Sequence, residues 1–449
     1  MKNLSKKVGF ISLGCAKNLT DTETMLALLE QNDMEIVSNP VDADVLVVNT
    51  CAFIDSAKSE SIEAILEMAE YKKQNCKMLV VTGCLAQRYK EEIFAELGEV
   101  DAILGTNDYD KLAQTIDSFF KTNEKIIKVS HESEHITENL PRVLSTPPYS
   151  AYIKIADGCD NFCTYCIIPK LRGKYRSRPA KDIIEEAKKL AQGGVKELIL
   201  VAQDTAYYGM DGTGDNLCDL LKKLSLIDGI EWIRLQYCYP ENITDELIDQ
   251  IAENEKIVKY IDMPLQHISD SILKLMGRRS RRKAVEELIK KLRTKIPNLA
   301  IRTSIIVGFP NETEEDFQIL KDFLKEYRLD RVGVFTYSKE EDTPAYSMEN
   351  QIDEETKVKR MQILMEQQKA ISDELNKEKI GKTVSVIAEG YDEQNLCYVG
   401  RSFADTIEVD GMAYIYSDEE LFAGDIAEAI IVDAHEYDIT VKVVSIKRA

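Results

Sequence analysis

Short apolar runs alternate with amphipathic stretches through the first 120 residues, and this alternation limits the possible folds more than any other feature of the chain. The runs are brief and rich in Val, Ile and Leu, which is typical of strands buried on both faces. Strands separated by helices form parallel sheets. We therefore predict an open parallel α/β sheet in residues 1–122. The expected strands are Val8–Leu13, Asp44–Asn49, Lys77–Thr82 and Asp101–Leu104, and the expected helices are Asp21–Asn32, Ser56–Asn75, Arg88–Leu97 and Tyr109–Lys121.

A second series of strand and helix patterns extends through residues 151–350 and predicts a partial barrel. The expected strands are Tyr152–Ala156, Glu197–Ala202, Trp232–Tyr237, Tyr260–Met263, Ala300–Val307 and Arg331–Tyr337. A complete eight-fold barrel typically needs about 250 residues. Six strand–helix units in a shorter segment therefore indicate an incomplete (β/α)6 barrel. Residues 123–150 lack a clear period and contain Thr146-Pro147-Pro148, so we expect a linker there.

The last part of the chain differs in character from the first two. Residues 351–380 are predicted to form one long, charged connecting helix. Residues 381–449 hold short segments rich in Val, Ile, Ala and Tyr, interrupted by glycines and acidic residues, which indicates a small antiparallel β-barrel. The expected strands are Thr383–Glu389, Tyr398–Ser402, Asp405–Val409, Ile426–Asp433 and Asp438–Lys447.

Composition limits where the chain acts and what it binds. No apolar run approaches the roughly 20 residues that cross a bilayer, and residues 1–8 lack the apolar stretch of a secretory signal, so we expect a cytoplasmic protein with no membrane partner. In that reducing compartment the ten cysteines are expected to be structural thiols, metal ligands or reactive thiols. The net charge of −21 disfavours broad nucleic-acid binding and suits a basic partner, although acidity can also serve solubility alone.

Three closely spaced cysteines give the sharpest local signal. Cys159, Cys163 and Cys166 follow the first predicted strand of the barrel at spacing C-x3-C-x2-C. A tetrahedral zinc site usually takes four ligands, and no fourth cysteine or histidine lies close by. A four-iron cluster held by only three thiolates keeps one iron open for chemistry. The alternatives are three buried thiols, or a zinc site completed by a distant residue.

A second set of cysteines emerges only when the predicted strands are laid side by side. Cys15, Cys51 and Cys84 each follow one of the first three strands of the N-terminal sheet. The carboxyl ends of parallel strands share one edge of an open sheet, where ligands bind. We therefore expect these three thiols to converge on a second three-ligand cluster, although a single cysteine beside a strand is more often core filler. The remaining cysteines, Cys76, Cys218, Cys238 and Cys397, are predicted to be structural.

These motifs resemble, in order along the chain, those of the radical S-adenosylmethionine (SAM) methylthiotransferases. The C-x3-C-x2-C motif resembles the radical SAM signature, the three earlier cysteines resemble those of the methylthiotransferases, and residues 381–449 resemble their C-terminal TRAM domain. Within that family, Ser12-Leu13-Gly14-Cys15-Ala16-Lys17-Asn18 is similar to the branch that acts on ribosomal protein S12, whose usual form has Pro in place of Ala16. Ala202-Gln203-Asp204-Thr205 and Tyr337-Ser338-Lys339-Glu340-Glu341-Asp342-Thr343-Pro344 are also similar to that branch.

The resemblance implies an enzyme with SAM and two [4Fe–4S] clusters as cofactors. Cys159, Cys163 and Cys166 would hold the cluster that cleaves SAM to a 5′-deoxyadenosyl radical, which removes hydrogen from the β-carbon of an aspartate of S12. Cys15, Cys51 and Cys84 would hold the cluster that carries the methylthio sulfur. The implied partners are ribosomal protein S12, free or in the small ribosomal subunit, and a reductase that supplies electrons. The protein would position the cofactors and exclude water.

Weaker assignments concern contacts with SAM. By resemblance, Tyr165 lies near the adenine, and the segment from Ser304 to Gly308 meets the adenine through its backbone; barrel core is the alternative for both. Arg172, Lys174, Arg176 and Arg178 could neutralise a carboxylate of SAM or of the substrate, or form a solvated basic face. His267, after the fourth barrel strand, is expected to be a satisfied polar residue.

Two competing functions remain open from the sequence. A tRNA methylthiotransferase would use the same clusters, but residues 381–449 contain 14 Asp and Glu against 5 Lys and Arg, which makes tRNA an improbable partner. The basic run Arg278-Arg279-Ser280-Arg281-Arg282 argues the other way, because it could touch ribosomal RNA or simply be solvated. The second competitor is a non-enzymatic metal-binding protein such as a zinc scaffold.

Overall fold

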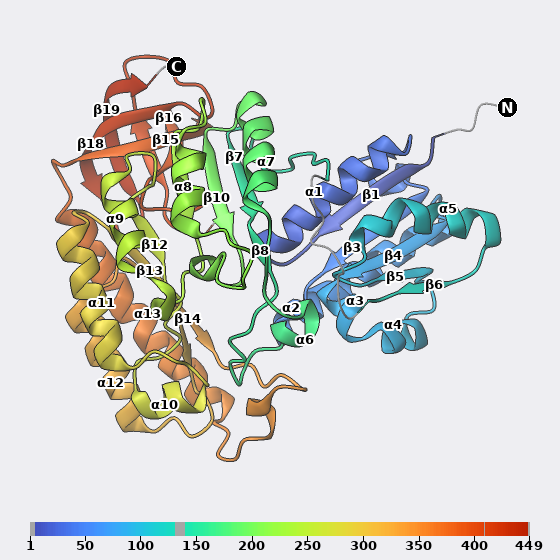
Figure 1. Ribbon diagram of the computed structural model, residues 1–449, viewed down its shortest axis with the longest axis horizontal. Helices are drawn as coiled ribbons and strands as arrows, with labels where there is room; N and C mark the ends of the chain where they lie inside the picture. The colour runs from blue at the N-terminus through green and yellow to red at the C-terminus, as the bar shows by residue number, and fades with distance from the viewer. Residues whose placement is uncertain (1–4, 131–139, 408, 448–449) are drawn as a thin grey trace.

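The N-terminal unit is an open parallel sheet covered by helices on both faces (Figure 1). The computed structural model describes residues 5–130, 140–407 and 409–447. The sheet order is β2-β1-β3-β4-β5-β6, and every neighbouring pair is parallel, as predicted. The strands are β1 (Lys7–Ser12), β2 (Glu35–Ile36), β3 (Val45–Thr50), β4 (Met78–Gly83), β5 (Ala102–Leu104) and β6 (Ile126–Lys128).

The two edge strands were not expected from the sequence. Strand β2 has two residues, which is too short for a period-2 pattern, and β6 lies within the stretch expected to be a linker. Both add to the sheet by pairing with a longer neighbour, β1 or β5, and this pairing is decided by tertiary structure. The rest of the expected linker includes residues 131–139, which lie outside the described residues.

The helices of this unit divide between the two faces of the sheet. Those on one face are α1 (Ala16–Gln31) and α5 (Leu112–Thr122), and those on the other are α2 (Asp55–Glu70), α3 (Cys84–Arg88) and α4 (Lys90–Glu96). Helix α1 begins five residues before the expected start at Asp21. Its first two turns are buried yet polar, with Lys17, Asn18, Asp21 and Glu23 all below 9% exposed. Apolar periodicity cannot detect such a segment, because the buried positions carry polar side chains.

The central unit is a half-open barrel of six parallel strands, as predicted. It consists of the three-stranded sheets β11-β10-β7 and β12-β13-β14, which a single bridge between Ile233 and Ile257 connects. The strands are β7 (Ser150–Lys154), β10 (Glu197–Val201), β11 (Trp232–Leu235), β12 (Tyr260–Asp262), β13 (Ala300–Val307) and β14 (Arg331–Thr336). The helices are α6 (Ile168–Arg172), α7 (Ala180–Gln192), α8 (Leu217–Ser225), α9 (Asp245–Glu253), α10 (Asp270–Leu275), α11 (Arg282–Lys295) and α12 (Glu314–Tyr327). The short pair β8 (Ala156–Asp157) and β9 (Arg176–Ser177) flanks the C-x3-C-x2-C loop.

The long helix α13 (Glu354–Lys377) leads to a closed five-stranded barrel, drawn in red in Figure 1. Its strands are β15 (Thr383–Asp392), β16 (Cys397–Ser402), β17 (Ala413–Tyr416), β18 (Ile426–Ala434) and β19 (Ile439–Lys447). Four neighbouring pairs are antiparallel and one, β17 with β19, is parallel. A closed ring with an odd number of strands cannot alternate direction throughout, so at least one pair must be parallel.

The expected strand at Asp405–Val409 is wrong for its described residues, which are irregular or in turns; residue 408 lies outside them. Asp405 instead accepts hydrogen bonds from Arg331 of β14, with the Nη2–Oδ1 distance at 2.7 Å. This buried ion pair holds the segment against the central unit, and β17 takes the place in the barrel that the sequence had assigned to it. In the part of the chain that the structure describes, no helix is long and apolar enough to cross a membrane.

A buried carboxylate joins the C-terminal barrel to the central unit. Glu197 of β10 is fully buried and pairs with Arg234 of β11 and with Arg401 of β16. Ser150 donates a further hydrogen bond to it at 2.7 Å. Burial opposes ionisation of Glu197, but the charges of Arg401 and Arg234 outweigh it and lower the pKa to about 2. The contact between these two units therefore depends on an ionised Glu197.

We predict that Glu197→Gln lowers the stability by roughly 3–5 kcal/mol at pH 7, because two buried guanidiniums lose their common counter-charge. The pKa of Glu197 is lower in the folded state, so its stabilisation is present above the ordinary value of 4.5 and is lost as the pH falls toward about 2. Thermal unfolding between pH 7 and pH 3 should show the wild type converging on the variant. The control Glu389→Gln removes a more exposed partner of Arg401 and should cost less. Equal losses for the two variants would contradict this account.

Candidate functional site

The structure places Cys15, Cys51 and Cys84 at one edge of the N-terminal sheet. Cys15 is the N-cap of α1, Cys51 directly follows β3, and Cys84 is the first residue of α3 after β4. Because β1, β3 and β4 are neighbours in the sheet, the three loops lie side by side at its carboxyl edge. The convergence expected from the strand pattern is therefore present in the structure.

Two glycines show how closely these loops approach. Gly14 and Gly83 have φ of +94° and +91°, a region that side chains disfavour. A Cβ on Gly14 would lie 3.3 Å from the Cys51 sulfur, and one on Gly83 would lie 2.5 Å from the carbonyl oxygen of Thr50. Only glycine lets the cysteine loops pack at this distance.

A single buried amide connects all three loops. The Asn18 Nδ2 donates to the carbonyl oxygens of Leu13, at 3.1 Å, and Thr50, at 2.9 Å. The Cys84 thiol lies 3.9 Å from the Asn18 Oδ1. Asn18 thus fixes the segments that carry Cys15, Cys51 and Cys84, and the sequence analysis did not identify this role.

The loop that carries Cys159, Cys163 and Cys166 is anchored to the helices beside the barrel. The Thr164 backbone N–H donates to the carbonyl of Met276 at 3.0 Å, and its hydroxyl donates to the carbonyl of Leu275 at 2.8 Å. Cys159 and Cys163 are buried, and Cys166 is partly exposed. Cys159, Cys163 and Cys166 are therefore held in a fixed loop against α10.

Two polar side chains contact sulfurs of this loop. The Asn161 amide lies 3.6 Å from the Cys159 sulfur, and Arg278 Nη1 lies 3.8 Å from the Cys163 sulfur. Arg278 is 3% exposed and its guanidinium lies over the Tyr239 ring, so for this residue the expected solvated or RNA-binding role is wrong. The basic run predicts a surface, but its first residue is drawn inward by the aromatic face and by the carbonyl of Pro264, to which it donates at 2.9 Å.

The residues expected to contact SAM lie around one end of β13. Tyr165 meets Phe309 edge to face, with 6.4 Å between ring centroids, and its hydroxyl has no hydrogen-bond partner among the described residues. Ser304 is on the partly exposed face of β13, which alternates with a buried face. Gly308 has φ +71°, and its N–H donates to the Glu312 carboxylate at 2.8 Å. The structure brings Tyr165 and the Gly308 turn together through Phe309.

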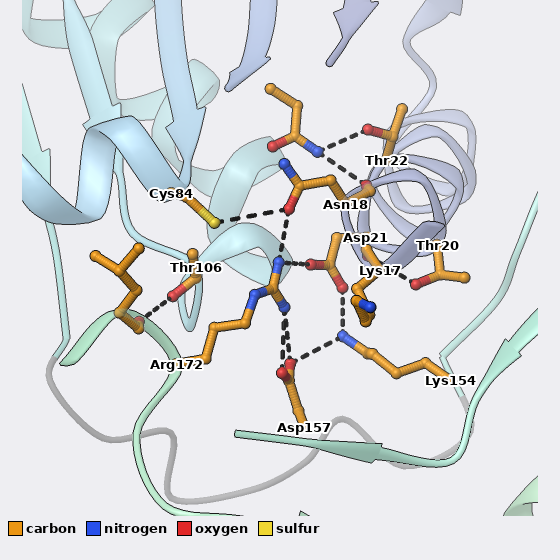
Figure 2. A network of polar contacts seen from close by, with 12 residues as sticks. Lys17, Asn18, Thr20, Asp21, Thr22, Cys84, Thr106, Lys154, Asp157 and Arg172 are labelled. Atoms are coloured by element: carbon orange, nitrogen blue, oxygen red, sulfur yellow. Dashed lines mark hydrogen bonds and ion pairs between the residues drawn. The ribbon is translucent and has the colours of Figure 1, made fainter. Parts of the chain in front are cut away.

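A buried ionic network connects the two cysteine triads (Figure 2). Arg172, six residues after Cys166, donates to Asp157 at 2.9 Å and to Asn18 at 2.6 Å, and pairs with Asp21 at 3.1 Å. Lys154 pairs with the same two carboxylates. Arg172 is 2% exposed, so the expectation of a ligand-binding or solvated arginine is replaced by a contact between domains.

The network contains two cations, Arg172 and Lys154, and two carboxylates, Asp21 and Asp157, so its charges balance. Burial opposes the charged form of Asp157, but Arg172 and Lys154 outweigh it and bring its pKa far below the ordinary value. Asp157 lies two residues before Cys159, and Asn18 lies three residues after Cys15. Through its contacts with Asp157 and Asn18, Arg172 therefore joins the chain segments that carry the two triads.

The residues present fit four-iron clusters better than a single metal ion. Within residues 5–130, 140–407 and 409–447, no three Cys, His, Asp or Glu side chains form a group that could hold one metal ion. An iron–sulfur cluster takes each thiolate on a different iron, so its ligands stand farther apart than those of zinc. Burial raises the pKa of Cys84 to about 12 and that of Cys159 to about 11, so cluster binding would displace protons from these thiols.

A cavity of about 400 Å³ lies where the three units meet. Cys15 lines it from the N-terminal unit, Tyr237 and Arg302 line it from the central unit, and Thr406 and Ile407 line it from the C-terminal barrel. Cys15 is exposed because it borders this cavity. Surrounding atoms still desolvate its thiol, but Lys17 and Arg172 outweigh that effect and lower the pKa of Cys15 below its ordinary value. The cavity thus gives access to the N-terminal triad.

Comparison with known families divides the chain into three matches. Residues 7–105 match the uncharacterized protein family UPF0004, residues 153–324 match the radical SAM superfamily, and residues 380–444 match the TRAM domain. The chain is 50% identical to ribosomal protein uS12 methylthiotransferase RimO of Acetivibrio thermocellus, over 98% of this chain and 99% of that protein. It is 51% identical to the protein of the same name from a Thermoanaerobacter species, over 97% and 99%.

Solved structures share the fold at low identity. The radical SAM methyltransferase TsrM of Kitasatospora setae, solved with cobalamin and a [4Fe–4S] cluster, superposes with a TM-score of 0.58 at 13% identity, over 76% of this chain and 77% of that one. The cobalamin-dependent SAM radical enzyme OxsB gives a TM-score of 0.51 at 13% identity, over 76% and 54%. At this identity the likeness extends to the fold alone.

The two triads predict the iron content. Anaerobically reconstituted protein should bind roughly eight irons, as two cubanes require. Replacing Cys15, Cys51 and Cys84 by Ala should remove about half of the iron, because Cys159, Cys163 and Cys166 lie on a different domain and keep their cluster. The control Cys218→Ala removes a buried thiol of α8 and should keep the full complement. Full iron content in the triple variant would disprove the N-terminal cluster.

Arg172 generates a second prediction. Arg172→Gln should destabilise the contact between the N-terminal and central units by roughly 3–5 kcal/mol, since it leaves buried carboxylates short of a counter-charge. Amide hydrogen exchange should rise in the loops of Cys15 and Cys51, and Arg172→Lys should not restore protection because it lacks the planar fork. The control Arg142→Gln breaks pairs with Glu23 and Glu186 at the same interface. If Arg142→Gln raised amide exchange in the cysteine loops as much as Arg172→Gln does, the specific role of Arg172 would be ruled out.

Proposed function

The chain belongs to the family of radical SAM methylthiotransferases that act on ribosomal protein uS12, and we propose that it places the methylthio group on the β-carbon of an aspartate of that protein. The family membership rests on about 50% identity over nearly the whole length of both chains. The observation in the structure that best supports the chemistry is the presence of two separate cysteine triads, one on each of two domains that a buried network joins.

SAM and two [4Fe–4S] clusters are the cofactors. We assign one cluster to Cys159, Cys163 and Cys166, and the other to Cys15, Cys51 and Cys84. When bound, these groups supply the reductive cleavage of SAM and the sulfur and methyl groups that are transferred. The chain itself contributes the fixed positions of the two triads, through Asn18 on one side and the anchored Thr164 loop on the other.

The chain also supplies a binding surface for SAM. We assign Tyr165, Ser304 and Gly308 to this surface. The buried Glu312 accepts a hydrogen bond from the Gly308 N–H and pairs with Arg360 at 2.8 Å. These contacts fix the turn after β13. The unpartnered Tyr165 hydroxyl is a buried polar group that lacks a hydrogen bond among the described residues, which supports a ligand beside it.

The cavity between the three units is the proposed place for the target side chain. It borders Cys15, and residues from all three units meet around it. The C-terminal barrel forms one wall and is strongly acidic, with a net charge of −9 over residues 381–449. Acidic surfaces attract basic protein partners and repel phosphate, which supports uS12 over tRNA as the substrate.

Three further assignments complete the proposal. A reductase supplies the electron for SAM cleavage, the enzyme acts in the cytoplasm, and its substrate is uS12 either free or in the small subunit. We assign the exposed acidic residues Asp418, Glu419 and Glu420 to contact with the basic partner.

The decisive experiment offers the reconstituted enzyme, SAM and a reductant to uS12 and to bulk tRNA in separate reactions. Intact-mass analysis should find an added methylthio group on uS12, and fragmentation should place it on an aspartate. Cys51→Ala should still form 5′-deoxyadenosine but should leave uS12 unmodified, whereas Cys163→Ala should form neither product. Modification of tRNA with none on uS12 would overturn the proposal in favour of the tRNA-modifying branch.

A further inference from the structure

We propose that Lys17 binds the side-chain carboxylate of the target aspartate. The inference rests on the proposed function and deepens it, because it names the residue that recognises the substrate group next to the reacting carbon.

Lys17 lies beside the cavity and next to the N-terminal triad. It is the second residue of α1, and its neighbours Cys15 and Ala16 both line the cavity between the three units. The residue is 7% exposed, so its side chain lies inside the protein and not on the outer surface. A lysine in the first turn of a helix gains nothing from the helix dipole, which favours acidic residues there. Its position is therefore not explained by helix stability.

The ammonium of Lys17 has an aromatic neighbour but no carboxylate. Its Nζ lies 3.6 Å from the ring centroid of Tyr237, which lines the same cavity. In the three described stretches of the chain, the Lys17 Nζ forms no ion pair and no hydrogen bond to another residue. A buried cation without a counter-charge is costly, and one aromatic face compensates for it only in part.

Three other cations of this region have carboxylate partners. Lys154 and Arg172 share Asp21 and Asp157, and Arg302 on the opposite wall pairs with Asp262 at 3.0 Å. Lys17 thus differs from Lys154, Arg172 and Arg302 in having no carboxylate partner among the described residues. The Lys17 Nζ lies against the ring of Tyr237, which lines the cavity, so an anion bound beside that ring would meet a desolvated ammonium. Such a site binds a carboxylate more strongly than a solvated lysine does.

The chemistry of the substrate matches this site. In an aspartate, the carboxylate is bonded directly to the β-carbon, the atom that we propose receives the methylthio group. A cation two residues from Cys15 that holds the carboxylate would therefore hold the β-carbon beside the triad that carries the sulfur. Neutral side chains of similar size would bind less well, because they would leave Lys17 uncompensated.

A double-mutant cycle on binding separates this role from a structural one. Wild-type holoenzyme first identifies the modified aspartate of uS12 by mass analysis, and that residue is then changed to Asn. Equilibrium dissociation constants are measured for both forms of uS12 with the wild type, Lys17→Met, Lys17→Gln and Lys17→Arg. In the wild type, the Asn form should bind about tenfold or more weakly. In Lys17→Met and Lys17→Gln, the two forms should bind alike, and Lys17→Arg should restore part of the preference.

Controls distinguish the remaining outcomes. Lys223→Met removes an exposed lysine of α8 and should leave every constant unchanged. Iron content and SAM cleavage without uS12 should match the wild type in all variants. Additive losses in the cycle, or a loss of iron in both Lys17→Met and Lys17→Gln, would overturn the role of Lys17 while leaving the methylthiotransferase function intact. Failure of the wild type to modify uS12 would overturn the proposed function, and this inference with it.

Discussion

The contact of Arg172 with Asn18 is the interaction on which both cysteine sites depend. Asn18 holds the three loops of the N-terminal triad, and Arg172 follows the C-x3-C-x2-C loop and also binds Asp157 just before it. Because all of these groups are buried, their charges must be matched within the protein, and Asp21 and Lys154 complete the balance. The position of one triad relative to the other is thus fixed by a few directional contacts between charged groups.

The three units contribute to the candidate site in different ways. The N-terminal sheet supplies an edge where parallel strands end together, so residues far apart in sequence meet there. The central unit supplies a local loop in which three cysteines are close in sequence, and its open side faces the other units across a cavity. The C-terminal barrel closes that cavity and is tied to the central unit through Glu197, Arg401 and the pair of Arg331 with Asp405. The residues that it places on the cavity wall, Thr406, Ile407 and Val409, are uncharged, so its acidity acts through the rest of its surface.

Sequence periodicity predicted elements whose buried faces are apolar and missed those whose buried faces are polar. The four inner strands of the N-terminal sheet and the strands of the half-barrel follow the Val- and Ile-rich runs closely. The start of α1 was missed because Lys17, Asn18 and Thr20 are buried polar residues, and such residues look exposed in a pattern of hydrophobicity. Arg278 was assigned to the surface for the same reason. For Lys17 and Asn18, the signal that could have identified the start of α1 is a polar segment that follows a predicted strand and adjoins a candidate ligand, Cys15.

The sequence by itself determined the order of the three units, the two cysteine triads and the acidity of the last barrel, because each depends on local pattern, spacing or charge. Tertiary structure alone decided that Arg172 faces the N-terminal unit, that β17 replaces the strand expected at 405–409, and that Lys17 lies over the Tyr237 ring without a carboxylate partner. These features arise from contacts between residues far apart in the chain, such as Asn18 with Arg172, 154 positions apart, and Arg331 with Asp405, 74 positions apart. Local pattern carries no information on such pairs, since the partner of a buried charge is chosen by the packing of whole domains.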